Sequence, residues 1–410
     1  MVPNGWIHTT FDKHIDLLNG FAFKSANYSS ETNDIRLLRG DNIEPGSLRW
    51  RGVKRWPKNE LDKLHKYQLE EHDFVIAMDR TWITSGLKVA EVKKSDLPCL
   101  LVQRVSRIRA LSKLDQSLLK QYFSSYRFEQ YVKSVQTETA VPHISPSQIR
   151  EFSFLLPPID EQCKIAKILS TWDKAINTTE CLINNSKQQK KALMQLLLTG
   201  KKRLFDDSGK PFEGIWEVVT LEQIAKYRRG SFPQPYGNPE WEDKVNGYPF
   251  VQVYDIDKNM KLKPSTKFKI SDAATGKSVF IPKETIIVSL QGSIGRVAIT
   301  QYDAYVDRTV LLFQNFLSPM NKVFFAYVIQ ELFEIEKTKA PGGTIKTITK
   351  DVLRNFKILI PALKEQQRIA AVLNNADKEI QLVEQQLSDL KLEKKALMQQ
   401  LLTGKRRVLV

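Results

Sequence analysis

Two short fragments of the chain resemble parts of catalytic motifs, and both are incomplete. The fragment ATGKS at 274–278 has the end of a phosphate-binding loop, but Ser271 stands where such a loop needs its first glycine. The fragment PQPY at 233–236 is similar to the catalytic tetrad of amino-methyltransferases, yet it lacks the leading Asn or Asp and the adjacent pair of prolines. Neither fragment predicts a nucleotide-binding or methyl-transfer site.

The titratable residues form no pattern typical of a metal or hydrolytic site. No HExxH is present, and the histidines and cysteines do not share metal-ligand spacing; they are His8, His14, His65, His72, His143, Cys99, Cys163 and Cys181. Asp41, Asp79, Asp255 and Asp307 could be catalytic, but no nuclease-like cluster of Asp with Glu-x-Lys recurs, so turn caps are favoured. The sequence therefore predicts a binding protein without catalytic residues, cofactor or metal.

The charge of the chain points to a polyanionic partner. The net charge is +16 and the pI is about 9.5, which favours nucleic acid over a merely solvated basic surface. Two stretches, Ser47–Lys58 and Lys258–Lys269, each hold five basic side chains and no acid. Each follows a similar strand-and-turn pattern, at 35–43 and 249–257. This repetition favours nucleic acid as the partner.

Basic, amide and aromatic side chains in these stretches and in nearby loops are the expected contacts with nucleic acid. In the first half of the chain they are Arg49, Trp50, Arg51, Lys54, Arg55, Arg80, Trp82 and Arg104. In the second half they are Arg228, Arg229, Gln252, Lys258, Lys261, Lys263, Gln291, Arg296, Arg308 and Lys346. Each of them taken alone could equally be a solvated charge or a residue that caps a strand end.

A long helix that occurs twice must position these loops. Residues 156–203 and 360–407 align without a gap, with 23 identities in 48 positions. Neither copy contains proline or glycine between its first turn and TG near its end. The pattern predicts two helices of about 38 residues, or roughly 57 Å each.

Apolar residues recur along each helix at alternating steps of four and three, the heptad pattern of a helix that packs on another helix. The strongest positions for helix pairing or partner docking are Ile165, Leu169, Trp172, Ile176, Leu193, Leu197, Ile369, Leu373, Ile380, Leu387, Leu397 and Leu401. We expect the two helices to pair antiparallel. Their remaining apolar edges would be available to a further helical partner.

Each long helix follows a β-rich module, so the fold class is α+β with an internal duplication. The expected boundaries are 1–155 and 216–359 for the modules, 156–203 and 360–410 for the helices, and 204–215 for the linker. Strands are expected within 73–90, 99–108, 284–299 and 304–313, and shorter helices within 114–135 and 321–337.

The chain has no run of about 18 apolar residues and no apolar stretch near its start, so we expect neither a membrane span nor a signal peptide. Its three cysteines include no CxxC pair and cannot all form disulfides. These features favour a reduced, cytoplasmic compartment.

The repeated combination of a strand, PPIDEQ or PALKEQ, and a long helix ending in KKALMQLLLTGKKR resembles the specificity subunit of type I restriction-modification enzymes. The resemblance implies that the partner is double-stranded DNA, that each module is a target-recognition domain, and that each reads one half of a bipartite, asymmetric site through the contacts named above. It also implies that the helices set the spacer and dock two methyltransferase (modification) subunits, through which endonuclease/translocase (restriction) subunits join. Two alternatives remain: an enzyme whose catalytic site lies in the modules, and a coiled-coil scaffold that does not read DNA.

Overall fold

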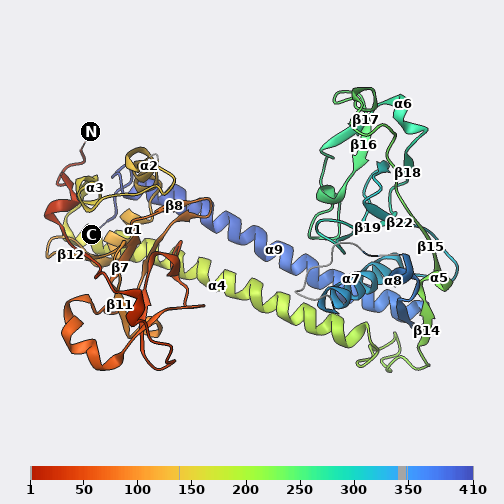
Figure 1. Cartoon of the computed structure of the whole chain (residues 1–410), viewed down its shortest axis with the longest axis horizontal. Coiled ribbons are helices and arrows are strands. Elements are labelled where there is room, and N and C mark those ends of the chain that lie inside the picture. The colour runs from red at the N-terminus through yellow and green to blue at the C-terminus, as the bar shows by residue number, and fades with distance from the viewer. Residues whose placement is uncertain (1, 138, 340–347, 349, 410) are drawn as a thin grey trace. The chain divides into compact units, whose positions relative to one another are not determined.

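The computed structural model describes residues 2–137, 139–339, 348 and 350–409, and it separates into two compact units (Figure 1). Unit 1 comprises Met1–Glu180 and Gln385–Val410, and unit 2 comprises Cys181–Glu384. Each unit therefore holds one β-rich module and part of each long helix. We call the modules module 1 (1–155) and module 2 (216–359).

Helices α4 (Ile159–Leu197) and α9 (Leu363–Leu401) have 39 residues each, which confirms the two predicted long helices. Acidic side chains occupy the first turn of both, where they complement the helix dipole. Gly200 and Gly404 follow the helix ends with φ of 70° and 67°, a backbone conformation in which glycine is favoured. In the ranges that the structure describes, no helix is long and apolar enough to cross a membrane.

Ion pairs show that α4 and α9 run antiparallel within each unit. Unit 1 contains Lys394–Asp173 at 2.7 Å and Lys391–Glu180 at 2.6 Å. Unit 2 contains Lys190–Asp377 at 2.6 Å and Lys187–Glu384 at 2.7 Å. Adding 204 to a residue number in one set gives its counterpart in the other, with the roles of the two helices exchanged. The pairing therefore follows the internal duplication.

The predicted apolar stripe lies in this helix pair, since all twelve of its residues are buried or half-buried. The ends of the stripe also complete the cores of the modules. Ile165, Leu169 and Leu401 belong to the core of module 1. Their counterparts Ile369, Leu373 and Leu197 belong to the core of module 2. Each module is thus built on the start of one long helix and the end of the other.

The two modules share one sheet topology. In module 1 a four-stranded sheet has the order β10 (Val89–Glu91), β7 (Phe74–Ala77), β12 (Val105–Ala110), β2 (Ile15–Asn19). Module 2 repeats it as β20 (Val297–Ile299), β19 (Ile286–Ser289), β22 (Val310–Phe316), β15 (Ala225–Arg229). All neighbouring strands in both sheets are antiparallel.

A second sheet in each module contains one parallel pair. In module 1 it has the order β11 (Cys99–Leu101), β3 (Ile35–Leu38), β6 (Arg55–Trp56), with β11 and β3 parallel. In module 2 it has the order β17 (Phe268–Ile270), β16 (Tyr248–Val251), β21 (Ala304–Val306), β18 (Val279–Ile281), with β16 and β21 parallel.

Short hairpins and helices complete the modules. Two-stranded ladders pair β1 (Ile7–Thr10) with β13 (Ser153–Leu156), β14 (Glu217–Thr220) with β23 (Lys357–Ile360), β4 (Ile43–Glu44) with β5 (Ser47–Leu48), and β8 (Trp82–Ile83) with β9 (Gly86–Leu87). The remaining helices are α1 (Gln116–Phe123), α2 (Tyr126–Val135), α3 (Pro146–Glu151), α5 (Leu221–Ile224), α6 (Asp272–Thr275), α7 (Lys322–Lys339) and α8 (Lys350–Arg354).

The structure differs from two sequence expectations. The segment 114–135, expected to be one helical stretch, is divided into α1 and α2. Ser124 ends the first helix and Ser125 caps the second, because the Ser125 hydroxyl accepts a hydrogen bond from the Phe128 N–H at 3.2 Å. The segments 99–108 and 304–313 each hold two strands that belong to different sheets.

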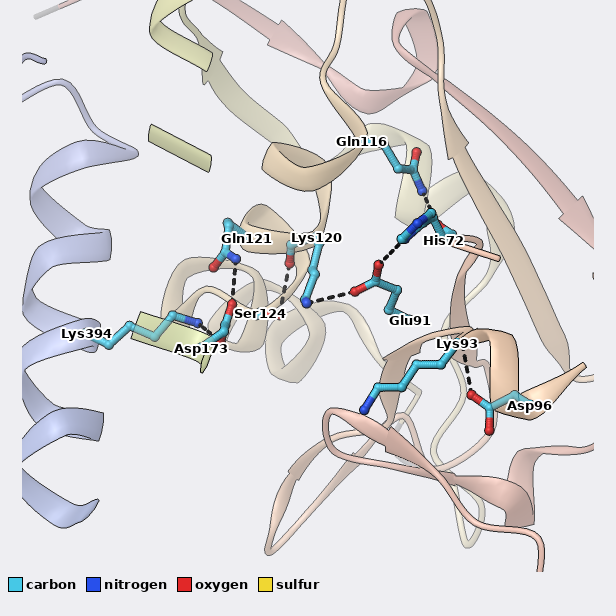
Figure 2. Close-up of polar contacts among 10 residues, drawn as sticks. All are labelled: His72, Glu91, Lys93, Asp96, Gln116, Lys120, Gln121, Ser124, Asp173 and Lys394. Atoms are coloured by element: carbon cyan, nitrogen blue, oxygen red, sulfur yellow. Dashed lines mark hydrogen bonds and ion pairs between the residues drawn. The ribbon is translucent and has the colours of Figure 1, made fainter. Parts of the chain in front are cut away.

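Polar contacts join module 1 to the helix pair (Figure 2). Gln121 of α1 donates to the Asp173 carboxylate at 2.8 Å, and Lys394 reaches the same carboxylate at 2.7 Å. One residue earlier on α1, Lys120 pairs with Glu91 at 2.8 Å, and Glu91 also meets the His72 ring at 2.8 Å. Helix α1 therefore connects the sheet of module 1 to both long helices.

We expect Leu401→Ala and Leu197→Ala each to lower the free energy of unfolding by about 2–5 kcal/mol, because both leucines are fully packed where a long helix completes a module core. Urea unfolding followed by circular dichroism measures the change. Leu392→Ala and Leu382→Ala are matched controls at exposed positions of α9, and they should change stability by less than about 0.5 kcal/mol. Equal effects at core and control positions would contradict this assignment.

A second expectation concerns pH. The hydrogen bond to Glu91 raises the pKa of His72 above its ordinary value of 6.5. A raised pKa stabilises the folded state below the ordinary value, and this contribution is lost as the pH rises through the raised pKa. His72→Asn keeps a residue type that tolerates the φ of 71° at this position. The stability difference between wild type and variant should shrink from about pH 6 to pH 8 in parallel urea titrations, and a constant difference would contradict the contact.

Candidate nucleic-acid interface

The parallel strand pair in each module brings two loops to one sheet edge. Strands β3 and β11 end at the same edge of module 1, as β16 and β21 do in module 2. The loops that follow them carry Arg39 and Arg104 in module 1, and Gln252 and Arg308 in module 2. We call this edge, with the hairpin described next, the strand-end edge. Such an edge is where open sheets commonly place binding groups.

The turn of a hairpin in the four-stranded sheet joins the same edge. In module 1 the Met78 N–H donates to the Arg104 carbonyl at 2.9 Å, and in module 2 the Leu290 N–H donates to the Thr309 carbonyl at 2.8 Å. These bonds hold the β7–β10 and β19–β20 connections beside the loops that follow β11 and β21. The connections contribute Arg80 and Lys88 in module 1, and Gln291 and Arg296 in module 2.

In module 1 the strand-end edge encloses a cavity of about 380 Å³. Its donor side chains are Arg39, Arg80, Lys88, Gln103 and Arg104. Two carboxylates, Asp41 and Asp79, also line it; Asp41 lies 3.4 Å from Arg39, and Asp79 lies 3.8 Å from Arg104. Cations outnumber acids, so the cavity is suited to an anionic ligand rich in hydrogen-bond acceptors.

Lys88 is the half-buried cation of this cavity. A Cβ at Gly40 would lie 3.9 Å from its Nζ, so the ammonium sits against the backbone of the β3 loop. Burial lowers the pKa of Lys88, and Arg80 acts in the same direction, whereas Asp41 and Asp79 oppose the shift. The ammonium is therefore held where a new acceptor would stabilise its charge.

Two arginines of the cavity have left-handed backbones. Arg80 has a φ of 47° and Arg104 a φ of 70°. Residues other than glycine adopt this conformation at a cost of roughly 1 kcal/mol or more, and such residues concentrate at functional sites. The Arg80 N–H donates to the Pro142 carbonyl at 2.6 Å, which holds the turn in place. The backbone thus fixes the points from which both side chains extend.

Module 2 presents different side chains at the same edge. The Gln252 side-chain oxygen accepts from the Tyr254 hydroxyl, and burial raises the pKa of Tyr254 to about 12. The Arg308 guanidinium lies 5.8 Å from the centre of the Tyr236 ring. Arg296 donates to the Ile256 carbonyl at 3.3 Å. Gln252 here takes the place of Arg39, and Thr309 takes the place of Arg104.

The basic stretch of module 1 is more engaged in the fold than the sequence indicated. Trp50 donates to Asp96 at 2.7 Å, and Arg55 donates to a backbone carbonyl at 2.7 Å. Arg49 pairs with Glu44 at 3.2 Å. Arg51 and Lys54 are exposed. The structure thus brings Arg80 and Arg104 into the cavity and leaves the other predicted contacts of module 1 elsewhere.

Trp82 packs against α2, where its indole donates to Glu129 at 3.2 Å and lies beneath the Lys133 ammonium. In module 2, Lys258 pairs with Glu384 of α9 at 3.2 Å. Arg228 and Arg229 are exposed on β15. Lys261 and Lys263 are exposed in the loop between β16 and β17. Lys346 lies outside the described residues.

Sequence reasoning missed Arg39, Lys88 and Gln103. Arg39 and Gln103 follow strands that turn out to be parallel neighbours, and an early pairing of 35–38 with 99–101 would have found them. Lys88 has an equivalent that was predicted: the Ala77 N–H donates to the Lys88 carbonyl at 3.0 Å, as the Ser289 N–H donates to the Arg296 carbonyl at 2.9 Å. Comparison of the two copies at this hairpin is the signal that identifies it.

The two motif fragments have unsuitable surroundings for catalysis. Ala274 and Thr275 end the four-residue helix α6, whereas the corresponding residues of a phosphate-binding loop open a helix. Within the described residues, no three His, Cys, Asp or Glu side chains are grouped so that they could hold a metal ion.

The chain matches the family model described as "Type I restriction modification DNA specificity domain" over residues 16–186 and again over 214–392. It is 35% identical to the type I restriction enzyme EcoAI specificity subunit of Escherichia coli, over 46% of this chain and 31% of that protein. It is 23% identical to the EcoBI specificity subunit of Escherichia coli, over 90% of this chain and 78% of that protein. The chain spans less than two thirds of the length of several matched relatives, including 48% of the MjaVIII specificity subunit of Methanocaldococcus jannaschii.

Solved structures share the fold. A chain from a structural study of complex assembly and conformational transition of the type I restriction-modification system has a TM-score of 0.60 at 16% identity, covering 99% of this chain and all of that one. The specificity subunit from M. genitalium has a TM-score of 0.55 at 13% identity, with 98% of both chains covered. The two family matches together span most of the sequence and both modules, and the chain therefore belongs to the type I restriction-modification DNA specificity family.

Proposed function

We propose that this chain is the non-catalytic subunit that reads a bipartite, asymmetric DNA sequence for a type I restriction-modification complex in the cytoplasm. Module 1, within 1–155, reads one half-site, and module 2, within 216–359, reads the other. Helices α4 and α9 set the number of base pairs between the half-sites. Methylation and cleavage take place on partner subunits.

The observation that carries this proposal is the strand-end edge, which has one backbone plan and two sets of side chains. Arg39, Arg80, Lys88 and Arg104 in module 1 correspond by topology to Gln252, Gly292, Arg296 and Thr309 in module 2. Arginine and lysine recognise the acceptor atoms of guanine, while glutamine pairs with adenine. Two such edges with different donors are suited to two half-sites of different sequence.

Exposed cations near the edges supply contacts that do not depend on sequence. Arg51 and Lys54 in module 1, and Lys261 and Lys263 in module 2, are exposed side chains of the basic stretches. Such residues neutralise phosphates and give an affinity that falls as salt concentration rises. Contacts with base edges then add affinity for the correct sequence to this non-specific binding.

The helix pair offers surface to partner proteins. Leu382 and Leu392 of α9 are 71% and 64% exposed, and Leu182 and Leu196 of α4 are 49% and 40% exposed. These leucines lie outside the stripe that joins the two helices. We propose that two modification subunits dock on the helices through such residues, and that restriction subunits join the complex through the modification subunits.

The first test is binding by the complex of this chain with its modification subunits. Methylation mapping of the host genome identifies the bipartite site, and competition binding then compares it with scrambled DNA. We expect the intact site to bind at least about 10³-fold more tightly, which is the lower range for specific DNA-binding proteins. Scrambling either half-site should remove most of this preference. Equal binding to all sequences would refute the proposed function.

Lys88→Met and Arg296→Met test the two edges separately. Each substitution removes a charge that lies at the equivalent position of one module, so each should cost about 1–3 kcal/mol on the cognate site and relax discrimination in one half-site only. Lys54→Met is the control for a phosphate contact: it should weaken all sequences alike and reduce the salt dependence. Loss of discrimination in both half-sites from one substitution would contradict separate reading.

A further inference from the structure

Unit 1 contains a cavity that the DNA-reading role does not use. It has a volume of about 380 Å³ and lies between the α1–α2 turn of module 1 and the C-terminal part of α9. Its walls are largely apolar and include four aromatic rings, those of Tyr122, Tyr126, Phe152 and Phe154. Aliphatic side chains close the other side, namely Ile176 of α4 with Met398 and Leu402 of α9.

The mouth of the cavity is cationic. Arg127, Lys391, Lys394 and Lys395 line it, whereas Glu129 is the one acidic side chain among its described lining residues. Glu129 is already paired with Lys133. The N-terminus of the ten-residue helix α2 also points its dipole toward this region, since Ser125, Tyr126 and Arg127 all line the cavity.

Two of these cations have no carboxylate partner in the described part of the chain. Lys391 and Lys394 pair with Glu180 and Asp173. Lys395, by contrast, lies 4.6 Å from the centre of the Tyr126 ring, and Arg127 lies 5.9 Å from that of Phe152. Both positive charges therefore lie over aromatic faces. The anionic group of a ligand would supply the negative partner that they lack in the described part of the chain.

The helix break at Ser124 and Ser125 forms part of the cavity wall. In unit 2 the equivalent segment is the continuous helix α7, in which Tyr327 donates to Asp377 as Gln121 donates to Asp173 in unit 1. Helix α7 passes through the position where module 1 turns. The turn that lines the cavity is therefore a departure from the internal duplication.

We propose that this cavity binds a small amphiphilic anion, with an aromatic or acyl body against the rings and a carboxylate, sulfonate or phosphate head between Arg127 and Lys395. The volume matches sites for small organic ligands, which begin at about 300 Å³. A bound ligand contacts both module 1 and α9, and it stabilises unit 1 as a consequence.

The probe for this site is 8-anilinonaphthalene-1-sulfonate, an aromatic anion whose fluorescence rises in apolar surroundings. Titration of the full chain should show one saturable site per chain with a dissociation constant on the order of 10 μM. Decanoate should displace the probe, whereas decyltrimethylammonium, which has the same alkyl chain and the opposite charge, should not. Equal displacement by both compounds would reduce the site to a non-specific apolar surface and overturn the proposal.

The double variant Arg127→Gln with Lys395→Gln should weaken probe binding by about tenfold, which corresponds to about 1.4 kcal/mol. Lys191→Gln is the matched control, because Lys191 occupies the position of Lys395 in the other copy of the helix. Ser124→Trp, at an exposed position of the lining, should block the cavity without removing a charge. Urea unfolding verifies that each variant is folded.

Two further outcomes would refute the proposal: probe binding that persists unchanged in both the double variant and Ser124→Trp, and displacement of the probe by purified modification subunits but not by decanoate. The second result would assign the cavity to a protein interface. None of these measurements involves DNA, so the result is independent of the proposed reading function.

Discussion

The fold depends on a buried carboxylate at the first turn of each long helix. The side chains of Glu161 and Glu365 are 6% and 2% exposed, and each accepts hydrogen bonds from an arginine that follows the other helix. Arg203 binds Glu365 through two nitrogens at 2.7 and 2.8 Å. Arg407 binds Glu161 in the same way. A carboxylate that loses such a partner inside a protein costs about 3–5 kcal/mol.

These contacts fix the register of the helix pair from both ends. A tryptophan of each module donates to the same carboxylate, Trp6 to Glu161 at 3.3 Å and Trp216 to Glu365 at 3.2 Å. A slip of one heptad would move each arginine about 10 Å along the axis and leave a buried charge without its partner. In each unit, one glutamate therefore binds three segments: the start of a module, the start of a long helix, and the segment that follows the other long helix. A spacer-setting role requires this constancy of register and length.

The sequence was sufficient to predict the two long helices, but it was insufficient to predict which residues lie at the strand-end edges. The gap-free repeat and its heptads predicted two helices of about 38 residues, and α4 and α9 have 39 residues each, because length and periodicity are local properties. The places where the chain leaves one sheet for the other were not visible, since Gln103 and Arg104 lie between the apolar run 99–102 and Val105, and 99–108 was read as one strand region. Lys258 was expected at DNA, but the fold places it against Glu384, a residue 126 positions away. Such long-range pairings have no local signature, and they decide which basic residues remain available.

The electrostatics of the module 1 cavity follow from the same logic. The cavity gathers Arg39, Arg80, Lys88 and Arg104 against two carboxylates, and the lowered pKa of Lys88 shows that its charge is held at a cost. Like charges fixed at short range destabilise the free module, and acceptor atoms of a base or phosphate would relieve that repulsion when they enter. An ammonium that is already desolvated loses less hydration on binding than an exposed one. More of its interaction energy therefore contributes to the difference in binding free energy between the correct base and a wrong one. Because the side chains that repel one another lie at strand ends, the residues there can change without disturbing the ladders, and the helix frame is left intact.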